Sequence, residues 1–217
     1  MHRSARRRLP ASAAVSACFV DFCGDGEPSV VREDPVVFQV TSGAASSTLG
    51  PVIRLAEPPR LVWPTQEVRV SYLVGEQADC LLRGTPTEWL DAASQDFTGF
   101  VAARRGVRIR WEVPATIFWY ISGEYYLGSL VIRHQLTPEL ADVGGHIGYH
   151  VVAPWRRQGH ATRMLTAGLA KCRELGLGRV FLTCAVDNQP SRRVILANGG
   201  VPDGRRGGED RFWISLP

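Results

Sequence analysis

The feature that most constrains this 217-residue chain is a β-like run that turns through a short basic loop into an amphipathic helix. The run covers residues 145–152, and the loop reads Arg-Arg-Gln-Gly-His-Ala over 156–161. After the loop, apolar or small residues recur at the i, i+3, i+4 spacing of one buried helix face. These residues are Ala161, Met164, Leu165, Gly168, Leu169, Cys172 and Leu175. The pattern predicts a strand, a loop and a helix packed back on the sheet.

The loop has the properties of an anion site. The first turn of a helix presents unpaired backbone N–H groups at the positive end of the helix dipole, where a pyrophosphate binds readily. Gly159 allows the backbone to approach a phosphate closely, and the small Ala161 keeps the first turn open. We therefore interpret residues 156–161 as a pyrophosphate-binding loop.

The residues after the helix extend the pattern. Gly176 offers a helix C-cap. An apolar strand is predicted over 180–186, followed by Asp-Asn-Gln-Pro-Ser and a short helix over 192–197. A plain β-α-β unit with a basic surface loop also has this outline. A Rossmann unit fits less well, because Arg157 stands where its G-x-G-x-x-G fingerprint has the first glycine.

Residues 145–200 resemble the acetyl-CoA-binding core of the GNAT (Gcn5-related) N-acetyltransferase superfamily. Its consensus Q/R-x-x-G-x-G/A is matched by residues 156–161, and its Asn near the start of the next helix by Asn188. The phrases GGHIGY and DNQPSRRVILANGG are similar to one bacterial branch of predicted acetyltransferases. The resemblance implies an α+β fold. Its mixed, mostly antiparallel sheet is flanked by helices and splayed between strands four and five.

The element order from Arg60 onward fits this superfamily. Thr65 is expected to cap the first helix, and two helical stretches are predicted between Val68 and Arg105. Strands are predicted at 61–63, at 115–121 and 125–134 as a hairpin, and at 211–216 pairing near 200–201. The GNAT domain is thus expected over 59–217. Residues 1–58 are expected to be a disordered extension or the product of a start assigned too early, with a short strand over Val36–Val40 as the alternative.

The resemblance implies which residues contact acetyl-CoA. The pantetheine arm is expected at Val151 and Val152, and the pyrophosphate along the loop, where His160 suits phosphate contact or solvent exposure. Asn188 contacts the cofactor or its water, or alternatively acts as a plain helix N-cap. The arginine pairs near 156 and 192 are interpreted as phosphate partners. The full expected set is Val151, Val152, Arg156, Arg157, Gln158, Gly159, His160, Ala161, Thr162, Asn188 and Ser191.

The expected catalytic groups are His146 and Tyr149. In much of the superfamily a Tyr seven residues after the Asn protonates the thiolate, but here that position is Ile195. Tyr149 and Cys184 are the substitutes. His146 is the candidate base; alternatively it only orders the preceding glycine turn, and water and positioning perform the deprotonation. Strand alternation places Tyr149 on the face opposite His146.

The predicted function is the transfer of acetyl from acetyl-CoA to a primary amine of a small molecule or peptide. The alternative is a catalytically inactive acyl-CoA-binding module that senses or scaffolds, and the missing Tyr keeps it open. The sequence does not identify the acceptor. Homodimer formation is also left open.

Composition bounds the partners. The net charge is +4, yet only Lys171 among the 25 basic residues is lysine, and the arginines are scattered, so no nucleic-acid partner is expected. No apolar run approaches the ~20 residues of a membrane span. The five cysteines include no C-x-x-C pair, no metal-ligand spacing is visible, and Cys172 and Cys184 fit buried thiols. A cytoplasmic location is predicted, because the weakly apolar segment after the Arg-rich N-terminus is dominated by Ala and Ser and is soon broken by Asp21 and Asp25.

Overall fold

The computed structural model describes residues 55–216. The predicted strand at Val36–Val40 and nearly all of the expected extension over 1–58 lie outside the described residues. Within the described range, no helix is both long and apolar enough to cross a membrane.

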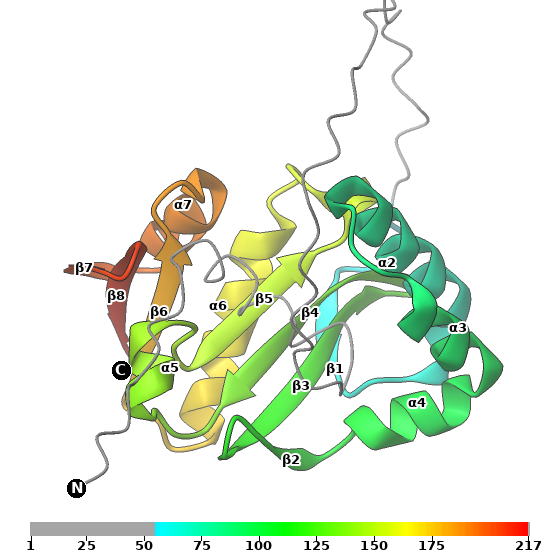
Figure 1. Ribbon diagram of the computed structural model, residues 1–217, viewed down its shortest axis with the longest axis horizontal. Coiled ribbons are helices and arrows are strands. Elements are labelled where there is room, and N and C mark those ends of the chain that lie inside the picture. Colours follow the sequence, from blue (N-terminus) through cyan, green and yellow to red (C-terminus); the bar gives the residue numbers. More distant parts are fainter. Residues whose placement is uncertain (1–54, 217) are drawn as a thin grey trace, which may run out of the picture.

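The strands form two sheets (Figure 1). The first has the order β1-β3-β4-β5, and β2 also pairs with β3. The second has the order β6-β8-β7, and every ladder in both sheets is antiparallel. The bounds are β1 (Arg60–Val62), β2 (Val107–Arg110), β3 (Val113–Ser122), β4 (Tyr125–Arg133), β5 (Ile147–Val151), β6 (Arg179–Ala185), β7 (Val201–Arg206) and β8 (Glu209–Ser215).

Helices cover both faces of the first sheet. Ser129 and Leu130 are consecutive residues of β4, so their side chains point to opposite faces. Ser129 contacts the network beneath α2, whereas Leu130 packs against Gly168 of α6. The helices are η2 (Gln66–Val68), α2 (Arg69–Arg83), α3 (Glu88–Gln95), α4 (Phe97–Arg104), α5 (Pro138–Asp142), η3 (Ala153–Trp155), α6 (His160–Glu174) and α7 (Gln189–Ala197).

The core beneath α2 is aromatic. Tyr72 of α2 stacks on Trp119 of β3 with ring centroids 4.5 Å apart and lies 4.7 Å from the ring of Tyr126. On the other face, Met164 and Leu165 of α6 are fully buried. The amphipathic pattern predicted for the helix after the loop is therefore confirmed from Met164 to Cys172, but Leu175, predicted on the same face, is exposed because α6 ends at Glu174.

The expected order of elements is confirmed, with three local differences, of which the first is the strand β2, which was not predicted. The hairpin of β3 and β4, the final strand β8 paired with β7, and Thr65 as a cap all agree with prediction. The second helical stretch, however, is divided into α3 and α4, because the side chain of Asp96 accepts a hydrogen bond from Gly99 N–H and starts a new helix. The region 135–144 also contains the short helix α5, capped by Thr137.

The two sheets meet at one end of β5 and β6. The backbone N–H of His146 donates to the Phe181 carbonyl at 2.7 Å, and the Phe181 N–H donates to His146 Nδ1 at 2.9 Å. Nearby, Gly144 N–H donates to Thr183 Oγ1 at 2.9 Å. Beyond this junction, β5 and β6 belong to separate sheets. The expected splay between these two strands is therefore present.

The first prediction concerns this junction. A Cβ on Gly145 would collide with the Phe181 backbone, whereas a Cβ on Gly123 would meet open space; both residues have positive φ, 66° and 52°. Gly123→Ala should cost about 1–2 kcal/mol for the left-handed backbone alone. Gly145→Ala should cost a further ~1–3 kcal/mol from overpacking. Urea denaturation of both variants measures the difference, and equal losses would contradict a tight junction.

Candidate functional site

The loop between η3 and α6 carries an unusual backbone. Arg157 has φ 63° and Gly159 has φ 77°, both left-handed, and α6 starts without a side-chain cap. The first backbone N–H groups of a helix have no intrahelical partner, and at the start of α6 no side chain replaces that partner. Successive N–H groups in such turns form a concave anion site at the positive end of a helix. The predicted pyrophosphate loop therefore has the backbone conformation of an anion site.

The arginines beside the loop differ in their contacts. Arg157 is exposed and makes no ion pair within the described range. Arg156 instead donates from Nε to the Val151 carbonyl at 2.8 Å and from Nη2 to Asp79 Oδ2 at 2.5 Å. Arg192, also interpreted as a phosphate partner, donates to Asp210 Oδ2 at 2.6 Å. Arg156 and Arg192 are thus held by acidic residues of the protein itself.

The side chain of His160 is buried, so the expectation that it is exposed to solvent is wrong. His160 is only 4% exposed, and its ring lies edge-on to Trp155 and Tyr120. Burial lowers the pKa of His160, and the charge of Arg163 lowers it further. The ring is therefore neutral near pH 7 and adds no positive charge to an anion site. The packing of the ring instead fixes the start of α6.

Three predicted site residues meet across the split. The hydroxyl of Tyr149, on β5, lies 2.8 Å from Ser191 Oγ in the first turn of α7. The side chain of Asn188 accepts from Ser191 N–H at 3.1 Å, which is the N-cap role left open for it. Ile195, one turn further along α7, is fully buried. The tyrosine hydroxyl of this site therefore comes from β5 instead of α7.

His146 lies at the closed end of the split. Its Nδ1 accepts the Phe181 N–H, which requires the proton of the neutral ring to be on Nε2. Burial lowers the pKa of His146, and the positive charges of Arg133 and Arg179 add to the shift. His146 immediately precedes β5 and its ring contacts β6, whereas the Tyr149 hydroxyl contacts α7. The structure therefore does not bring the two predicted catalytic side chains together.

The remaining predicted residues lie at the end of β5 and in the first turn of α6. Val151 and Val152 are buried at the end of β5, and Val152 N–H donates to the Leu127 carbonyl at 3.0 Å. Gln158 is exposed, whereas Ala161 packs partly against the core. The Thr162 carbonyl accepts from Asn198 Nδ2 at 3.3 Å, which ties α6 to the end of α7. Cys184 is buried, and no group of three potential metal-binding side chains occurs in the described part of the chain.

A family model described as "Acetyltransferase (GNAT) family" matches residues 56–199. The match spans the first sheet, the loop, β6 and the helices described above, and it ends before β7 and β8. The chain belongs to the acetyltransferase (GNAT) family. It is thereby placed among acyltransferase enzymes, as predicted. A search of curated proteins found no match.

Solved structures agree with the GNAT fold. An acetyltransferase (GNAT family) from Bacillus anthracis shares 19% identity, with a TM-score of 0.51, over 76% of this chain and 98% of its own. Mycobacterium smegmatis RimJ, in complex with CoA-disulfide, shares 20% identity, with a TM-score of 0.51, over 73% of this chain and 85% of its own. The Salmonella typhimurium enzyme that modifies the N-terminal serine of ribosomal protein L7/L12 gives 16% and 0.51, over 73% and 95%. At these identities the likeness concerns the fold alone.

This GNAT protein also contains a buried polar network that sequence reasoning missed. Glu76 of α2 accepts from Tyr126 Oη at 2.8 Å and pairs with His150 Nε2 at 2.9 Å, while Ser129 Oγ lies 3.1 Å from His150 Nδ1. All four residues are buried. Although burial raises the pKa of Glu76, the charge and hydrogen bond of His150 outweigh it, and the net pKa is lowered. The sequence signal was an acidic residue on the apolar face of an amphipathic helix.

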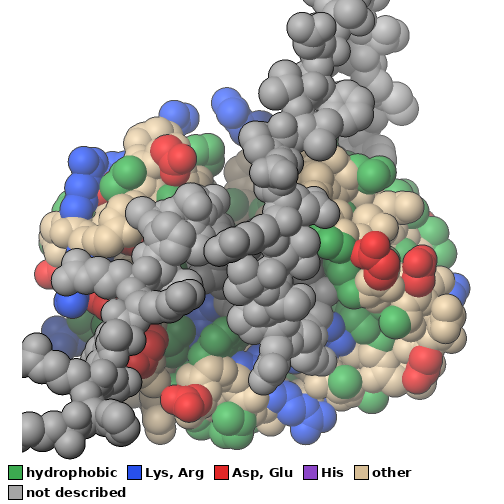
Figure 2. Space-filling model, in the orientation of Figure 1, with side chains coloured by type: hydrophobic (Ala, Val, Ile, Leu, Met, Phe, Trp, Pro, Cys, Tyr) green, Lys and Arg blue, Asp and Glu red, His purple; other side chains and the backbone are tan. Residues whose placement is uncertain are grey.

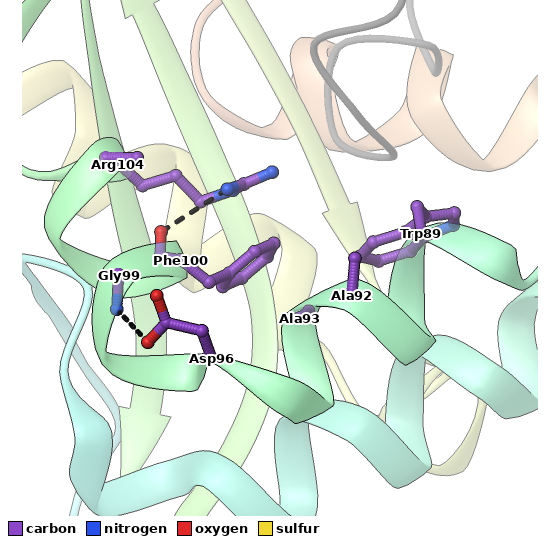
Figure 3. Close-up of a pocket in the computed structure, with 8 residues that line it drawn as sticks. Trp89, Ala92, Ala93, Asp96, Gly99, Phe100 and Arg104 are labelled. Atoms are coloured by element: carbon purple, nitrogen blue, oxygen red, sulfur yellow. Dashed lines mark hydrogen bonds between the residues drawn. The ribbon is translucent and has the colours of Figure 1, made fainter.

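A hollow of about 350 Å³ lies on the helices α3 and α4. Trp89 of α3 and Phe100 of α4 form its walls (Figure 3), and the guanidinium of Arg104 lies 3.5 Å from the centre of the Phe100 ring. None of the eight lining residues belongs to β5, the loop or α7. This hollow is therefore separate from the candidate GNAT site.

The visible charge pattern agrees with a scattered distribution of arginine. On the face seen in Figure 2, the Lys and Arg side chains of the described residues are spread over several elements instead of forming one patch. Several are paired: Arg192 and Arg205 both bind Asp210. The net positive charge of the chain therefore does not define a single binding face in this view.

The second prediction concerns Glu76. A lowered pKa means that the ionised carboxylate stabilises the fold above about pH 4.5, the ordinary value, and that this stabilisation is lost as the pH falls through the folded pKa. Glu76→Gln removes the titration, so its free energy of unfolding should depend less on pH in this range. Glu76→Ala should destabilise by roughly 3–5 kcal/mol, as for one half of a buried pair. Denaturation between pH 3 and 7 measures both, with the exposed Glu88→Gln as control. An unchanged pH dependence in Glu76→Gln would contradict the prediction.

Proposed function

We propose that this protein transfers an acetyl group from acetyl-CoA to a primary amine of a small molecule or peptide. The observation that carries the proposal is the uncapped start of α6, where the loop donors lie at the open end of the split between β5 and β6. Family membership supports the same reading. Bound acetyl-CoA would supply the thioester that acylates the amine.

The loop backbone over residues 157–162 would hold the pyrophosphate, with Arg157 adding a positive charge. Val151, Val152, Asn188 and Ser191 would line the pantetheine arm, because they border the split between the sheets. The backbone carries most of the binding in this proposal, since the guanidinium of Arg156 is occupied by internal partners.

Tyr149 is the proposed proton donor to the thiolate. Its hydroxyl reaches the first turn of α7, one turn before Ile195, where relatives place their tyrosine. Tyr149 on β5 would thus supply the proton donor that Ile195 on α7 cannot supply. Cys184 is a weaker candidate, because its side chain is buried in β6.

The assignment of His146 as a base has a physical cost. The Nδ1 lone pair accepts a backbone hydrogen bond, and a proton arriving there would break it and leave the Phe181 N–H at the sheet junction unpaired. We infer that His146 holds the junction and that the amine loses its proton to water. A base and a support of the junction differ in how the rate would respond to the loss of a titrating ring at position 146.

The third prediction tests the loop. Gly159→Val should weaken coenzyme A binding roughly tenfold or more, because a β-branched residue at φ 77° distorts the donors. Gly176→Val is a matched control: it lies at the other end of α6, with φ 80° and open space around it. Calorimetry with coenzyme A compares the two. Equal affinities, with both folds intact by circular dichroism, would remove the loop from the site.

The fourth prediction tests turnover. Coenzyme A release over a panel of primary amines should reveal an acceptor, and Tyr149→Phe should lower kcat by ~10²–10⁴-fold, as for a general acid. Ser191→Ala, which keeps the phenol, should change kcat far less. Binding of coenzyme A without release for any amine would favour the inactive sensor or scaffold.

His146→Asn completes this experiment. An Asn carbonyl can accept the Phe181 N–H in place of Nδ1 but cannot titrate. If His146 only holds the junction, this variant keeps its rate and pH profile. If His146 is the base, the rate falls by the ~10²–10⁴-fold of a lost general base, and the acidic limb of the profile, which lies below the ordinary pKa of histidine, disappears.

A further inference from the structure

A buried carboxylate links helix α2 to the start of the loop. Asp79 is fully buried, yet its Oδ1 accepts the Ala153 N–H at 2.7 Å and its Oδ2 accepts from Arg156 Nη2 at 2.5 Å. A second arginine, Arg83, lies 3.7 Å from Oδ2. Ala153 is the first residue of η3, and Arg156 directly follows its last residue. One carboxylate therefore fixes both ends of the turn that leads into the loop.

Arg156 completes this connection from the other side. Its Nε donates at 2.8 Å to the carbonyl of Val151, which is the last residue of β5, and its Nη2 binds Asp79. The guanidinium thus joins the strand end to α2 through two donors of its rigid fork. One turn before Asp79, a Cβ on Gly75 would lie only 3.1 Å from Val152 Cγ2, so the helix and the strand end are also in close contact.

This geometry changes the interpretation of Arg156. The arginine is 42% exposed and stands beside the anion site, but its charge is paired with a carboxylate, and two of its donor nitrogens have partners. If Arg156 bound the phosphate directly, removing the carboxylate of Asp79 would strengthen anion binding, because a negative charge near the site opposes it. If Asp79 and Arg156 instead position the loop, the same change would weaken anion binding, because the loop donors depend on the turn that Asp79 fixes.

We propose that Asp79 and Arg156 form a positioning pair, which holds the backbone donors of residues 157–162 in their binding conformation without touching the ligand. This proposal rests on the proposed function of the loop in binding coenzyme A. It identifies α2, on the opposite face from α6, as the support of the phosphate site.

The fifth prediction is an effect of unexpected sign. Asp79→Asn removes a negative charge beside an anion site, yet it should weaken coenzyme A binding by roughly 10- to 100-fold, the effect of losing hydrogen bonds to a charged group. Arg156→Lys keeps the charge but cannot reach both acceptors, and should weaken binding similarly. The double variant should bind about as weakly as either single variant, since both disrupt the same unit. Calorimetry of the full chain with coenzyme A at fixed salt measures all four proteins.

The outcomes are distinguishable. If the wild type does not bind coenzyme A, the proposed function fails. If the wild type binds and Asp79→Asn binds equally or more tightly, the positioning pair is overturned while the proposed function stands. If Asp79→Asn does not fold, Arg156→Lys decides, because its half-exposed side chain tolerates change: near-wild-type affinity overturns the pair.

Hydrogen exchange provides a local readout. In Arg156→Lys, the hydrogen-bonded amides of Ala153, Trp155 and Arg156 should exchange faster, whereas those of β3 and β4 should keep their protection. Faster exchange throughout the chain would indicate a general loss of stability and would overturn a specific positioning role. The exposed Arg157→Lys is the matched control, and its exchange should remain that of the wild type.

Discussion

The hydrogen bonds between His146 and Phe181 determine the shape of the whole site. They join the two sheets at one end of β5 and β6, using a side-chain nitrogen where a regular ladder would use a carbonyl. Because the junction stops there, the two strands separate, and the loop and the start of α7 face the resulting opening. Gly145 is part of the same constraint, since only a glycine permits this approach of the chain to Phe181.

The opening is bordered by two supports of different chemistry. On the α6 side, the site is built from backbone donors and the Tyr149–Ser191 contact. On the α2 side, the buried carboxylates Glu76 and Asp79 bind β4, β5 and the turn after β5. Buried charges are expensive unless paired. Their presence on the apolar face of one helix indicates that α2 is held in a single register against the strands that border the site.

The substitution at Ile195 illustrates how a family site can be rearranged. Ile195 is buried in α7, so no proton donor can be supplied from that position. The Tyr149 hydroxyl reaches the same helix from β5. A side chain of β5 thus reaches α7 near the position of Ile195, which is the geometric basis for proposing Tyr149 as the proton donor.

The sequence by itself determined most of the order of strands and helices, the loop and most of the buried face of α6, because these depend on local periodicity and on glycine at defined positions; the short edge strand β2 was missed. It did not determine the partners of charged residues. Arg156 looked like a phosphate ligand and His146 like a base, since a sequence shows residue types near a motif but not the groups opposite them. Those groups, Asp79 and Phe181, are distant in the chain and are brought near only by packing. Burial of a charge or a lone pair then decides its partner, and burial is a property of the tertiary structure.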